Sequence, residues 1–542
     1  MPKRAATVPA TGITLDPAGP VPLHRQLYER LRAAILAGQL APGTRLPSTR
    51  SLAAELGVSR TTALAAYQQL GDEGYLDGRV GAGTTVAALS GPAPAPPGMP
   101  APPGTPGPPG TPGPPGTPGT PGTAGVSTGR GRSGAAPAPP SRPALSARGA
   151  ALAGIPWRRR PAGARPGGRP RAFQLGVPAL DAFPRQVWAR TLTRRARHSL
   201  GELLGYQDPA GYRPLREAIA AYLGMARGVR CTPERVLVVG GAQAGLNLAA
   251  RLLLDPGDPV WVEDPGYYGA RGALVGAGAR QVPVPLDADG LDVDGARRRE
   301  PGARLAYVTP SHQFPLGVTM SLPRRLALLA WAEEAGAFVL EDDYDSEYRY
   351  VGRPLPALQG LDRAGRVIYV GSFSKVLFPA LRIGYLVVPD DLVDAFTAAQ
   401  RFGEIHVPAL EQAALADFIA GGHLGRHVRR MRGLYAARGR ALVRAVRRAA
   451  GEALEVRSAH AGLHLVGWLP AGADDRAAAA AAAAHQVEAQ PLSAHALRPP
   501  ARGGLLLGYA AVPEPEIERA AGRLAAALRA ADRRGTPRPP RP

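Results

Sequence analysis

The segment GSFSKVLFPALRIGY (residues 371–385) contains Lys375, one of only two lysines in a chain of 542 residues. The other is Lys3, so 63 of the 65 basic residues are arginines. An arginine would serve wherever only a positive charge is needed, because its pKa keeps it cationic at any usable pH. A lysine can also lose its proton and attack a carbonyl carbon. We therefore predict that Lys375 is a nucleophile.

The sequence around this segment is typical of an α/β fold. From about residue 173, short apolar runs alternate with helical segments, which indicates a mostly parallel sheet covered by helices on both faces. The candidate strands are residues 236–240, 260–264, 305–309, 338–342, 367–373 and 383–388. Polar clusters follow several of them, at residues 240–243, 263–271, 309–317, 341–349 and 372–375. Because ligands bind at the carboxyl ends of such strands, we expect these clusters to converge on one site.

These clusters contain the groups that an aldehyde cofactor with a pyridinium ring and a phosphate requires. Lys375 supplies the amine for a Schiff base, either Asp342 or Asp343 can pair with the ring nitrogen, and Tyr267 can stack on the ring. The candidate phosphate donors are Ser372, Ser374, Arg382 and the amides of residues 240–243, which include Ala242 and Gln243. Each residue also has a structural interpretation, such as a surface arginine, a capping aspartate or a packing tyrosine. Their joint order along the chain favours the cofactor.

Residues 1–90 predict a small helical domain that ends in a hairpin. Apolar residues recur every four positions from Leu23 to Ile35, and Gly38 ends this first helix. Two shorter helices then meet at a sharp turn, the first capped by Ser48 and the second by Ser59. Residues 75–87 have the pattern of strand, glycine turn and strand, as in a wing.

The start of the last helix carries groups suited to DNA. Ser59, Arg60, Thr61 and Thr62 lie at its exposed N-terminal end, where amides and hydroxyls suit phosphates and Arg60 can reach a phosphate or a guanine edge. The alternative is an ordinary three-helix bundle with a hairpin that never touches DNA. The net charge of +22 favours polyanions as partners without establishing one.

Residues 91–168 are rich in Pro, Gly and Ala and predict an extended linker. Within it, a glycine stands at every third position from Gly104 to Gly122, which is the collagen period. A short triple helix would impose a trimer, but so few triplets favour a polyproline-II spacer.

Several classes of protein are disfavoured by composition. No apolar run is long enough to span a membrane, and no apolar segment follows the basic N-terminus, so we expect a cytoplasmic protein. Cys231 is the only cysteine, which excludes an intramolecular disulfide. His423 and His427 have the spacing of a helical metal pair, but no nearby acidic residue or cysteine completes a zinc shell, so we expect no metal.

Two regions of the chain resemble known families. The run from GQLAPGTRLPSTRSLAAELGVSRTTALAAYQQL to GYLDGRVGAGTTV resembles the GntR family of winged helix-turn-helix regulators. From about residue 204 onward, the order of the candidate cofactor residues resembles fold-type I pyridoxal-phosphate enzymes of the aminotransferase class. With the GntR-like head, the whole chain resembles MocR-type regulators. The phrases GYQDPAGYRPLREAIAAYL, VTPSHQFPLGVTMS, LEDDYDSEYRY and GSFSKVLFPALRIGY resemble that subfamily more closely than ordinary transaminases. This implies a winged helix-turn-helix at 1–90, a linker at 91–168 and an aminotransferase-like domain at 169–535, whose C-terminal lobe begins at about residue 401.

The resemblance also implies residue roles. In the head, Arg50, Ser59, Arg60, Thr61, Thr62 and the wing around Gly81 would face operator DNA. In the large domain, Lys375 would form the Schiff base with pyridoxal 5'-phosphate, Asp342 would pair with the ring nitrogen and Tyr344 would meet the ring hydroxyl. The phosphate would be held by Ser372, Ser374 and Arg382, and by Tyr206 of a neighbouring subunit. A head-to-tail homodimer is implied, with each head over the partner's large domain.

Two departures from ordinary aminotransferases bear on function. Phe314 precedes Pro315 where those enzymes have an asparagine, and Leu506 stands where they have an arginine that clamps the substrate carboxylate. Arg498 or Arg502 could substitute for that arginine. We therefore favour a transcription regulator that senses an amino acid or amine by aldimine exchange. The alternatives are a working aminotransferase with a DNA-binding head, a sensor of pyridoxal phosphate itself, and a cofactor-free dimerisation module.

Overall fold

The head is a winged helix-turn-helix. The computed structural model describes residues 13–19, 21–79, 83–87, 145–155, 170–198, 200–351 and 355–535. The head contains α1 (Leu23–Leu36), α2 (Thr49–Glu55), α3 (Arg60–Asp72) and the antiparallel hairpin of β1 (Leu76–Arg79) and β2 (Gly83–Val86). Both predicted caps are confirmed, because Ser48 Oγ accepts from the Ser51 amide and Ser59 Oγ from the Thr62 amide, each at 3.1 Å. Gly81 lies outside the described residues.

The large domain is built on an eight-stranded sheet with the order β3-β10-β9-β8-β7-β4-β5-β6. All six predicted strands are present: β3 (Val236–Val239), β4 (Pro259–Asp264), β7 (Leu305–Val308), β8 (Phe338–Asp343), β9 (Val367–Ser372) and β10 (Gly384–Val387). The sheet is mostly parallel, as predicted, but β10 runs antiparallel to both β3 and β9. The strand β5 (Arg280–Asp287) and the short β6 (Gly290–Leu291) were not predicted. Pro283 and Pro285 interrupt the apolar pattern of β5, and they are tolerated because it lies near the sheet edge.

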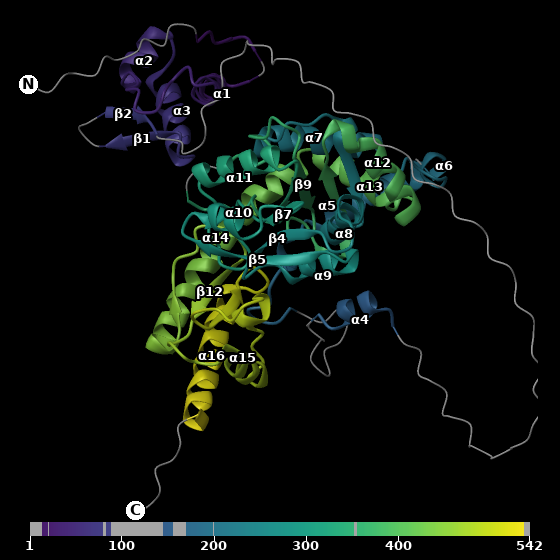
Figure 1. The fold of residues 1–542 in the computed structure, drawn as a ribbon, viewed down its shortest axis with the longest axis vertical. Helices are drawn as coiled ribbons and strands as arrows, with labels where there is room; N and C mark the ends of the chain where they lie inside the picture. The colour runs from purple at the N-terminus through teal and green to yellow at the C-terminus, as the bar shows by residue number, and fades with distance from the viewer. Residues whose placement is uncertain are drawn as a thin grey trace, which may run out of the picture.

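Helices cover both faces of the sheet, as Figure 1 shows. Alternate strand residues point to opposite faces, so Leu237 and Val239 pack against α8, α9 and α12, whereas Val236 and Val238 pack against α7 and α13. The helices are α5 (Arg185–His198), α6 (Leu200–Leu203), α7 (Arg213–Arg227), α8 (Ala242–Leu253), α9 (Tyr268–Ala277), α10 (Val293–Arg299), α11 (Leu322–Glu334), α12 (Val393–Gly403) and α13 (Ala409–Ala420).

A second lobe contains a four-stranded antiparallel sheet with the order β11-β12-β14-β13. Its strands are β11 (Glu455–Val456), β12 (His464–Trp468), β13 (Gln490–Pro491) and β14 (Gly504–Gly508). They pack with the long α14 (His423–Ala450), α15 (Asp475–Ala484) and α16 (Glu514–Gly535). The alanine-rich run forms α15, which begins where the Asp474 carboxylate accepts from two backbone amides. This lobe supplies one wall of the site described below.

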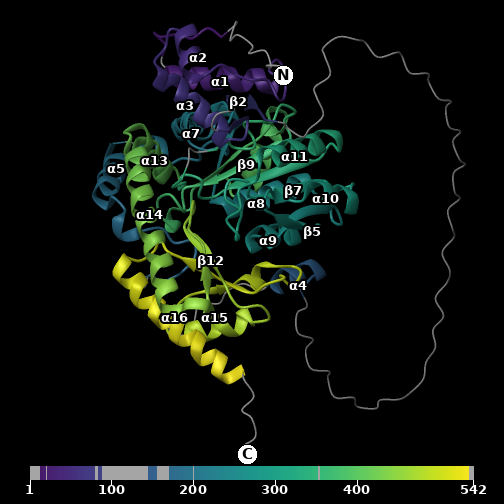
Figure 2. The same ribbon diagram turned by 90° about the vertical axis from the view of Figure 1, so that its left-hand side faces the viewer.

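The head packs on the large domain of its own chain, next to α7 and α11 (Figure 2). Leu322 and Leu361 of the large domain belong to the same apolar cluster as the core of the head. Arg25 of α1 donates hydrogen bonds to the carbonyls of Gly224 and Met225 in the last turn of α7. The expectation that the head lies over a partner's large domain concerns a second subunit and stays a prediction.

Part of the predicted linker is helical. Residues 147–153 form α4 (Ala147–Ala153), which packs against α9. The glycine repeat from Gly104 to Gly122 lies outside the described residues. Within the described ranges, no helix is both long and apolar enough to cross a membrane.

Candidate functional site

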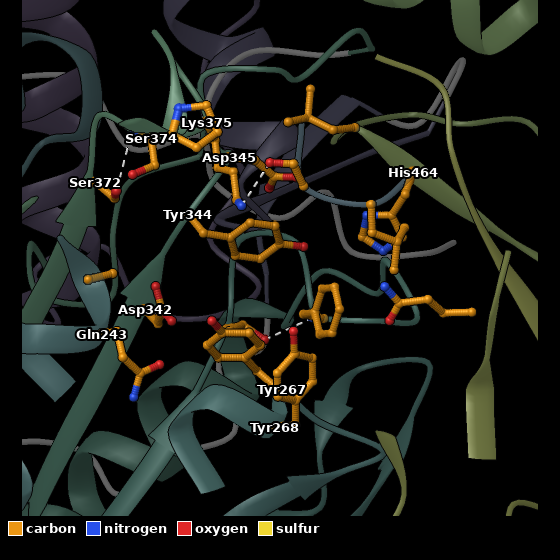
Figure 3. A pocket seen from close by; sticks show the side chains of 18 of the residues that line it. Gln243, Tyr267, Tyr268, Asp342, Tyr344, Asp345, Ser372, Ser374, Lys375 and His464 are labelled. Carbon is orange, nitrogen blue, oxygen red and sulfur yellow. Dashed lines mark hydrogen bonds between the residues drawn. The ribbon is translucent and has the colours of Figure 1, made fainter. Parts of the chain in front are cut away.

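A cavity of about 250 Å³ lies where the carboxyl ends of the parallel strands meet the second lobe. All five predicted polar clusters contribute to its lining, so the prediction that they converge is confirmed. Figure 3 shows Lys375 and Tyr344 near the middle of the site, Ser372, Ser374, Gln243 and Asp342 on one side, and His464 on the other.

Lys375 points into this cavity from the loop after β9. Its Nζ donates to the carbonyl of Gly176 at 2.9 Å. Gly176 has a φ of +70°, which favours glycine, and a Cβ built there would lie 2.7 Å from Nζ and would displace the lysine amine. Burial lowers the pKa of Lys375, an effect that the nearby Asp345 and Asp342 carboxylates partly oppose. The neutral amine, which is the nucleophilic form, is thereby favoured.

The structure distinguishes the two candidate aspartates. Asp343 already has hydrogen-bond donors, because its carboxylate accepts hydrogen bonds from Arg227 at 2.8 Å and from the Tyr369 hydroxyl at 2.6 Å. Asp342 lines the cavity, with Oδ2 accepting from the Tyr307 hydroxyl at 2.8 Å. Its other oxygen, Oδ1, is buried without a hydrogen-bond partner. Burial raises the pKa of Asp342 to about 6, although the Tyr307 hydrogen bond opposes the shift. Asp342 therefore has one oxygen available for a cationic donor.

The candidate phosphate donors surround the first turn of α8. The amides of Ala242 and Gln243 lie in that turn, whose N–H groups have no acceptors within the helix. The Ser372 and Ser374 side chains and the Arg382 guanidinium line the same end of the cavity. Gly241 precedes the helix with a φ of +92°, and a Cβ there would lie 3.2 Å from the Arg382 guanidinium. These groups form a cradle suited to an anion.

Aromatic side chains form the walls between the cradle and the second lobe. Tyr267 and Phe314 make an edge-on contact with ring centroids 5.8 Å apart, and Phe314 makes a similar contact with Tyr344 at 6.0 Å. The Tyr344 hydroxyl lies 2.9 Å from Nδ1 of His312, which lies 3.1 Å from the nearer oxygen of Asp345. Phe314 thus fills the position of the missing asparagine with an apolar ring.

The arginines offered as carboxylate clamps do not line this cavity. Arg498 and Arg502 line a separate cavity between β5 and the second lobe. Arg502 is paired there with Glu455 at 2.7 Å. Leu506 is fully buried in an apolar cluster that includes Leu175 and Phe314.

Sequence reasoning missed several lining residues. The cavity also contains Leu175, Gly176, Tyr268, Tyr307, Thr309, Asp345, Pro379, Leu463, His464 and Gln490. Asp345 lies within the predicted polar cluster at residues 341–349, so the sequence could have identified it as a residue of the site. His464 and Gln490 belong to the second lobe, and nothing local to their sequence connects them to the sheet.

Two other predicted residues lie away from the cavity lining. The Tyr206 side chain is 84% exposed and makes an edge-on contact with His406, with ring centroids 6.3 Å apart. His427 is buried, and its Nε2 lies 3.0 Å from the carbonyl of Val376, which gives this histidine a structural role. Among the residues that the structure describes, no group of three or more metal-ligating side chains is found.

The DNA-facing candidates in the head lie at the N-terminal ends of two helices, Arg50 in the first turn of α2 and the others at the start of α3. Arg50, Ser59, Arg60 and Thr61 are exposed, and Thr62 is half-buried behind them. Beneath this surface, the predicted core residues Ala63, Ala66, Tyr67 and Leu70 are buried. The start of α3 is therefore free to approach a major groove.

The residues present fit pyridoxal phosphate. The unpartnered Oδ1 of Asp342 suits a protonated ring nitrogen, the cradle at α8 suits a phosphate, and Figure 3 shows the Lys375 side chain near the middle of the same site. Asp342 and the cradle would thus hold the cofactor, and Lys375 would supply the amine that meets its aldehyde.

Comparisons with known proteins agree with both halves of the chain. Residues 23–86 match the family of bacterial regulatory proteins of the gntR type, and residues 173–524 match aminotransferase class I and II. A relative described as "Probable rhizopine catabolism regulatory protein MocR" from Rhizobium meliloti is 43% identical over 507 residues, 94% of each chain. The pyridoxine biosynthesis transcriptional regulator PdxR of Corynebacterium glutamicum is 33% identical over 78% of each chain.

Solved structures give the same fold for the large domain. LysN, an α-aminoadipate aminotransferase from Thermus thermophilus, is 30% identical with a TM-score of 0.62, over 67% of this chain and 92% of its own. That structure was solved with a phosphopyridoxyl-leucine adduct. The class I and II match and such neighbours imply pyridoxal phosphate, and the GntR-type head implies DNA binding. The chain belongs to the MocR-type transcription regulators, in which a GntR-family winged helix-turn-helix is joined to an aminotransferase-like domain of fold type I.

Proposed function

We propose that this regulator holds pyridoxal phosphate on Lys375 and changes its DNA binding when an amino acid or other amine takes the place of that lysine. One observation carries the proposal. A half-buried lysine and the unpartnered oxygen of Asp342 face one cavity, on a chain that also carries an exposed helix-turn-helix. Neither feature alone would connect an amine to DNA.

When bound, pyridoxal phosphate supplies an aldehyde carbon that condenses reversibly with a primary amine, releasing water. Lys375 would hold that carbon in the absence of a ligand amine. Burial lowers the pKa of Lys375, which favours the neutral amine that such a condensation needs. Asp342 would stabilise the proton on the ring nitrogen, and the α8 cradle would hold the phosphate.

A short structural path links the cavity to the head. Asp343, adjacent to Asp342 on β8, forms a buried ion pair with Arg227 at 2.8 Å. Arg227 is the last residue of α7, and Arg25 of the head binds carbonyls in the same turn. A ligand that prefers one position of β8 would therefore bias the head, provided that its affinities for the two arrangements differ.

We also propose that the working unit is a cytoplasmic head-to-tail homodimer. Large apolar residues are exposed in two segments of the chain. Leu204 and Tyr206 are 76% and 84% exposed in the first segment, and Phe402 is 87% exposed in the second. The ring contact between Tyr206 and His406 brings these two segments together. Burial of this patch by a second copy would place Tyr206 within a subunit interface, as its expected role at a neighbour's phosphate requires.

Catalysis of full transamination is the less favoured function. A transaminase must bind two carboxylate-bearing substrates in turn, and the described lining has no arginine beyond the phosphate cradle. Sensing of pyridoxal phosphate itself has one supporting observation, the similarity to a pyridoxine biosynthesis regulator. Steady keto-acid production would favour catalysis, and DNA binding that follows cofactor loading alone would favour cofactor sensing.

The deciding experiment is borohydride reduction of the cofactor-loaded protein, followed by peptide mass mapping. We expect one phosphopyridoxyl label, on Lys375, and none in the Lys375→Arg variant, which keeps the positive charge. The same preparations are then tested on DNA selected by the protein from a random pool, with and without candidate amines. A label on another residue, or DNA binding that responds to amines equally in K375R, would overturn the proposal.

A further inference from the structure

We propose that the ligand amine carries no carboxylate, and that its far end bears hydrogen-bond donors such as hydroxyl groups or a second ammonium. This inference rests on the proposed function and narrows its ligand class. It rests on the residues at the end of the cavity opposite the phosphate cradle. We call this end of the cavity the distal wall. The distal wall consists of Leu175, Phe314, Leu463, His464 and Gln490, and Asp345 lies beside Lys375 nearer the middle of the site.

The histidine of the distal wall has one ring nitrogen that can accept a hydrogen bond. His464 is only 5% exposed, and its Nε2 lies 3.1 Å from the carbonyl oxygen of Pro315. A carbonyl can only accept, so Nε2 carries the proton and Nδ1 keeps a lone pair. Burial and, to a smaller extent, the neighbouring His312 lower the pKa of His464 to about 4, so the ring is neutral at physiological pH. A neutral acceptor cannot bind a carboxylate.

The position that would clamp a carboxylate has become apolar. Leu506 is fully buried on β14 and packs in the cluster that contains Leu175 and Phe314, two members of the distal wall. Its direct cross-strand partner on β13 is Gln490, an uncharged residue that lines the cavity. Arg498 and Arg502 line the other cavity. The clamp is thus replaced by a leucine and an amide.

The charged residues that line the cavity also disfavour an anionic ligand. Among the described lining residues the cations are Lys375 and Arg382, and Arg382 stands in the phosphate cradle. Asp345 adds a buried carboxylate beside Lys375. A ligand carboxylate placed here would face Asp345 and the His464 lone pair without a bidentate donor, and an unpaired buried anion is strongly penalised. A hydroxyl or ammonium donor would satisfy the same groups.

The test compares matched amines that differ only in the acid group. Cofactor-loaded protein is titrated with alanine and alaninol, and with β-alanine and propanolamine, while the visible absorption of the bound cofactor and binding to the selected DNA are followed. We expect each amino alcohol to half-saturate the spectral change at a concentration at least about tenfold below that of its amino acid. Equal or tighter response to the amino acids would overturn the inference and leave the proposed function intact. No response to any amine, in protein that traps the cofactor on Lys375, would defeat both.

A substitution in the distal wall provides an independent check. Gln490→Arg places a guanidinium on the cross-strand neighbour of Leu506, and Gln490→Met is the uncharged control of similar length. We expect Q490R to shift the preference toward alanine and β-alanine by about tenfold or more, and Q490M to leave the preference for amino alcohols in place. If Q490R takes up cofactor with an unchanged absorption spectrum and keeps the original preference, this end of the cavity does not select the ligand and the inference fails.

Discussion

Replacement of Asp342 by asparagine is expected to have opposite effects on stability and on cofactor binding. Burial raises the pKa of Asp342 from its ordinary value of 3.8 to about 6. The folded state therefore disfavours the charged carboxylate, and the cofactor-free protein loses stability as pH rises from about 4 to about 6. This difference in pKa corresponds to about 3 kcal/mol. Asparagine carries no charge and still offers an oxygen to the Tyr307 hydroxyl, so D342N should be more stable by up to that amount above pH 6.

The same substitution should weaken the binding of pyridoxal phosphate. The carboxylate oxygen that has no partner in the cavity would be replaced by an amide, which cannot neutralise a protonated ring nitrogen. A hydrogen bond to a charged group contributes about 1.5–3 kcal/mol. The dissociation constant should therefore rise roughly 10- to 150-fold.

Two measurements separate these effects. Denaturant unfolding of cofactor-free protein, followed by tryptophan fluorescence between pH 4 and pH 8, gives the stability difference, and titration with pyridoxal phosphate gives the affinity. Asp343→Asn is the control, because it breaks the buried pair with Arg227 and should cost about 3–5 kcal/mol whether or not cofactor is present. The reasoning is refuted if D342N is less stable than the parent above pH 6, or if it binds the cofactor with undiminished affinity.

Three further outcomes are expected in the head. Arg60→Ala should weaken DNA binding and make the slope of log affinity against log salt shallower by about one, as measured by fluorescence anisotropy; an unchanged slope would mean that Arg60 contacts no phosphate. Ser59→Ala removes the acceptor of the Thr62 amide and should lower the stability of the head by about 1 kcal/mol in thermal unfolding, whereas Ser59→Asn should retain most of it. Arg25→Ala removes two hydrogen bonds to the last turn of α7 and should speed hydrogen exchange near Gly224; unchanged exchange would argue against coupling through this contact.

Features that depend on a few neighbouring residues were predictable. The caps at Ser48 and Ser59 follow from chemistry within three positions, and the six strands follow from apolar runs of a length that a covered sheet requires. The strand β5 was missed because Pro283 and Pro285 argue against a strand, and only its place near the sheet edge makes them acceptable. The direction of β10 depends on its neighbours in space, so no local pattern could indicate it.

The sequence by itself determined which side chain of the site can become a neutral amine and which segments surround it. The ability of Lys375 to become neutral is a property of the residue type, and parallel strands bring their carboxyl ends to one edge whatever the details of packing. Only the tertiary structure showed that Asp342 lines the cavity and that Asp343 pairs with Arg227 instead, because adjacent strand residues point to opposite faces. It also brought His464 and Gln490 to the cavity and directed Arg498 and Arg502 elsewhere. Those placements depend on how the second lobe packs against the sheet, which is a contact between distant parts of the chain.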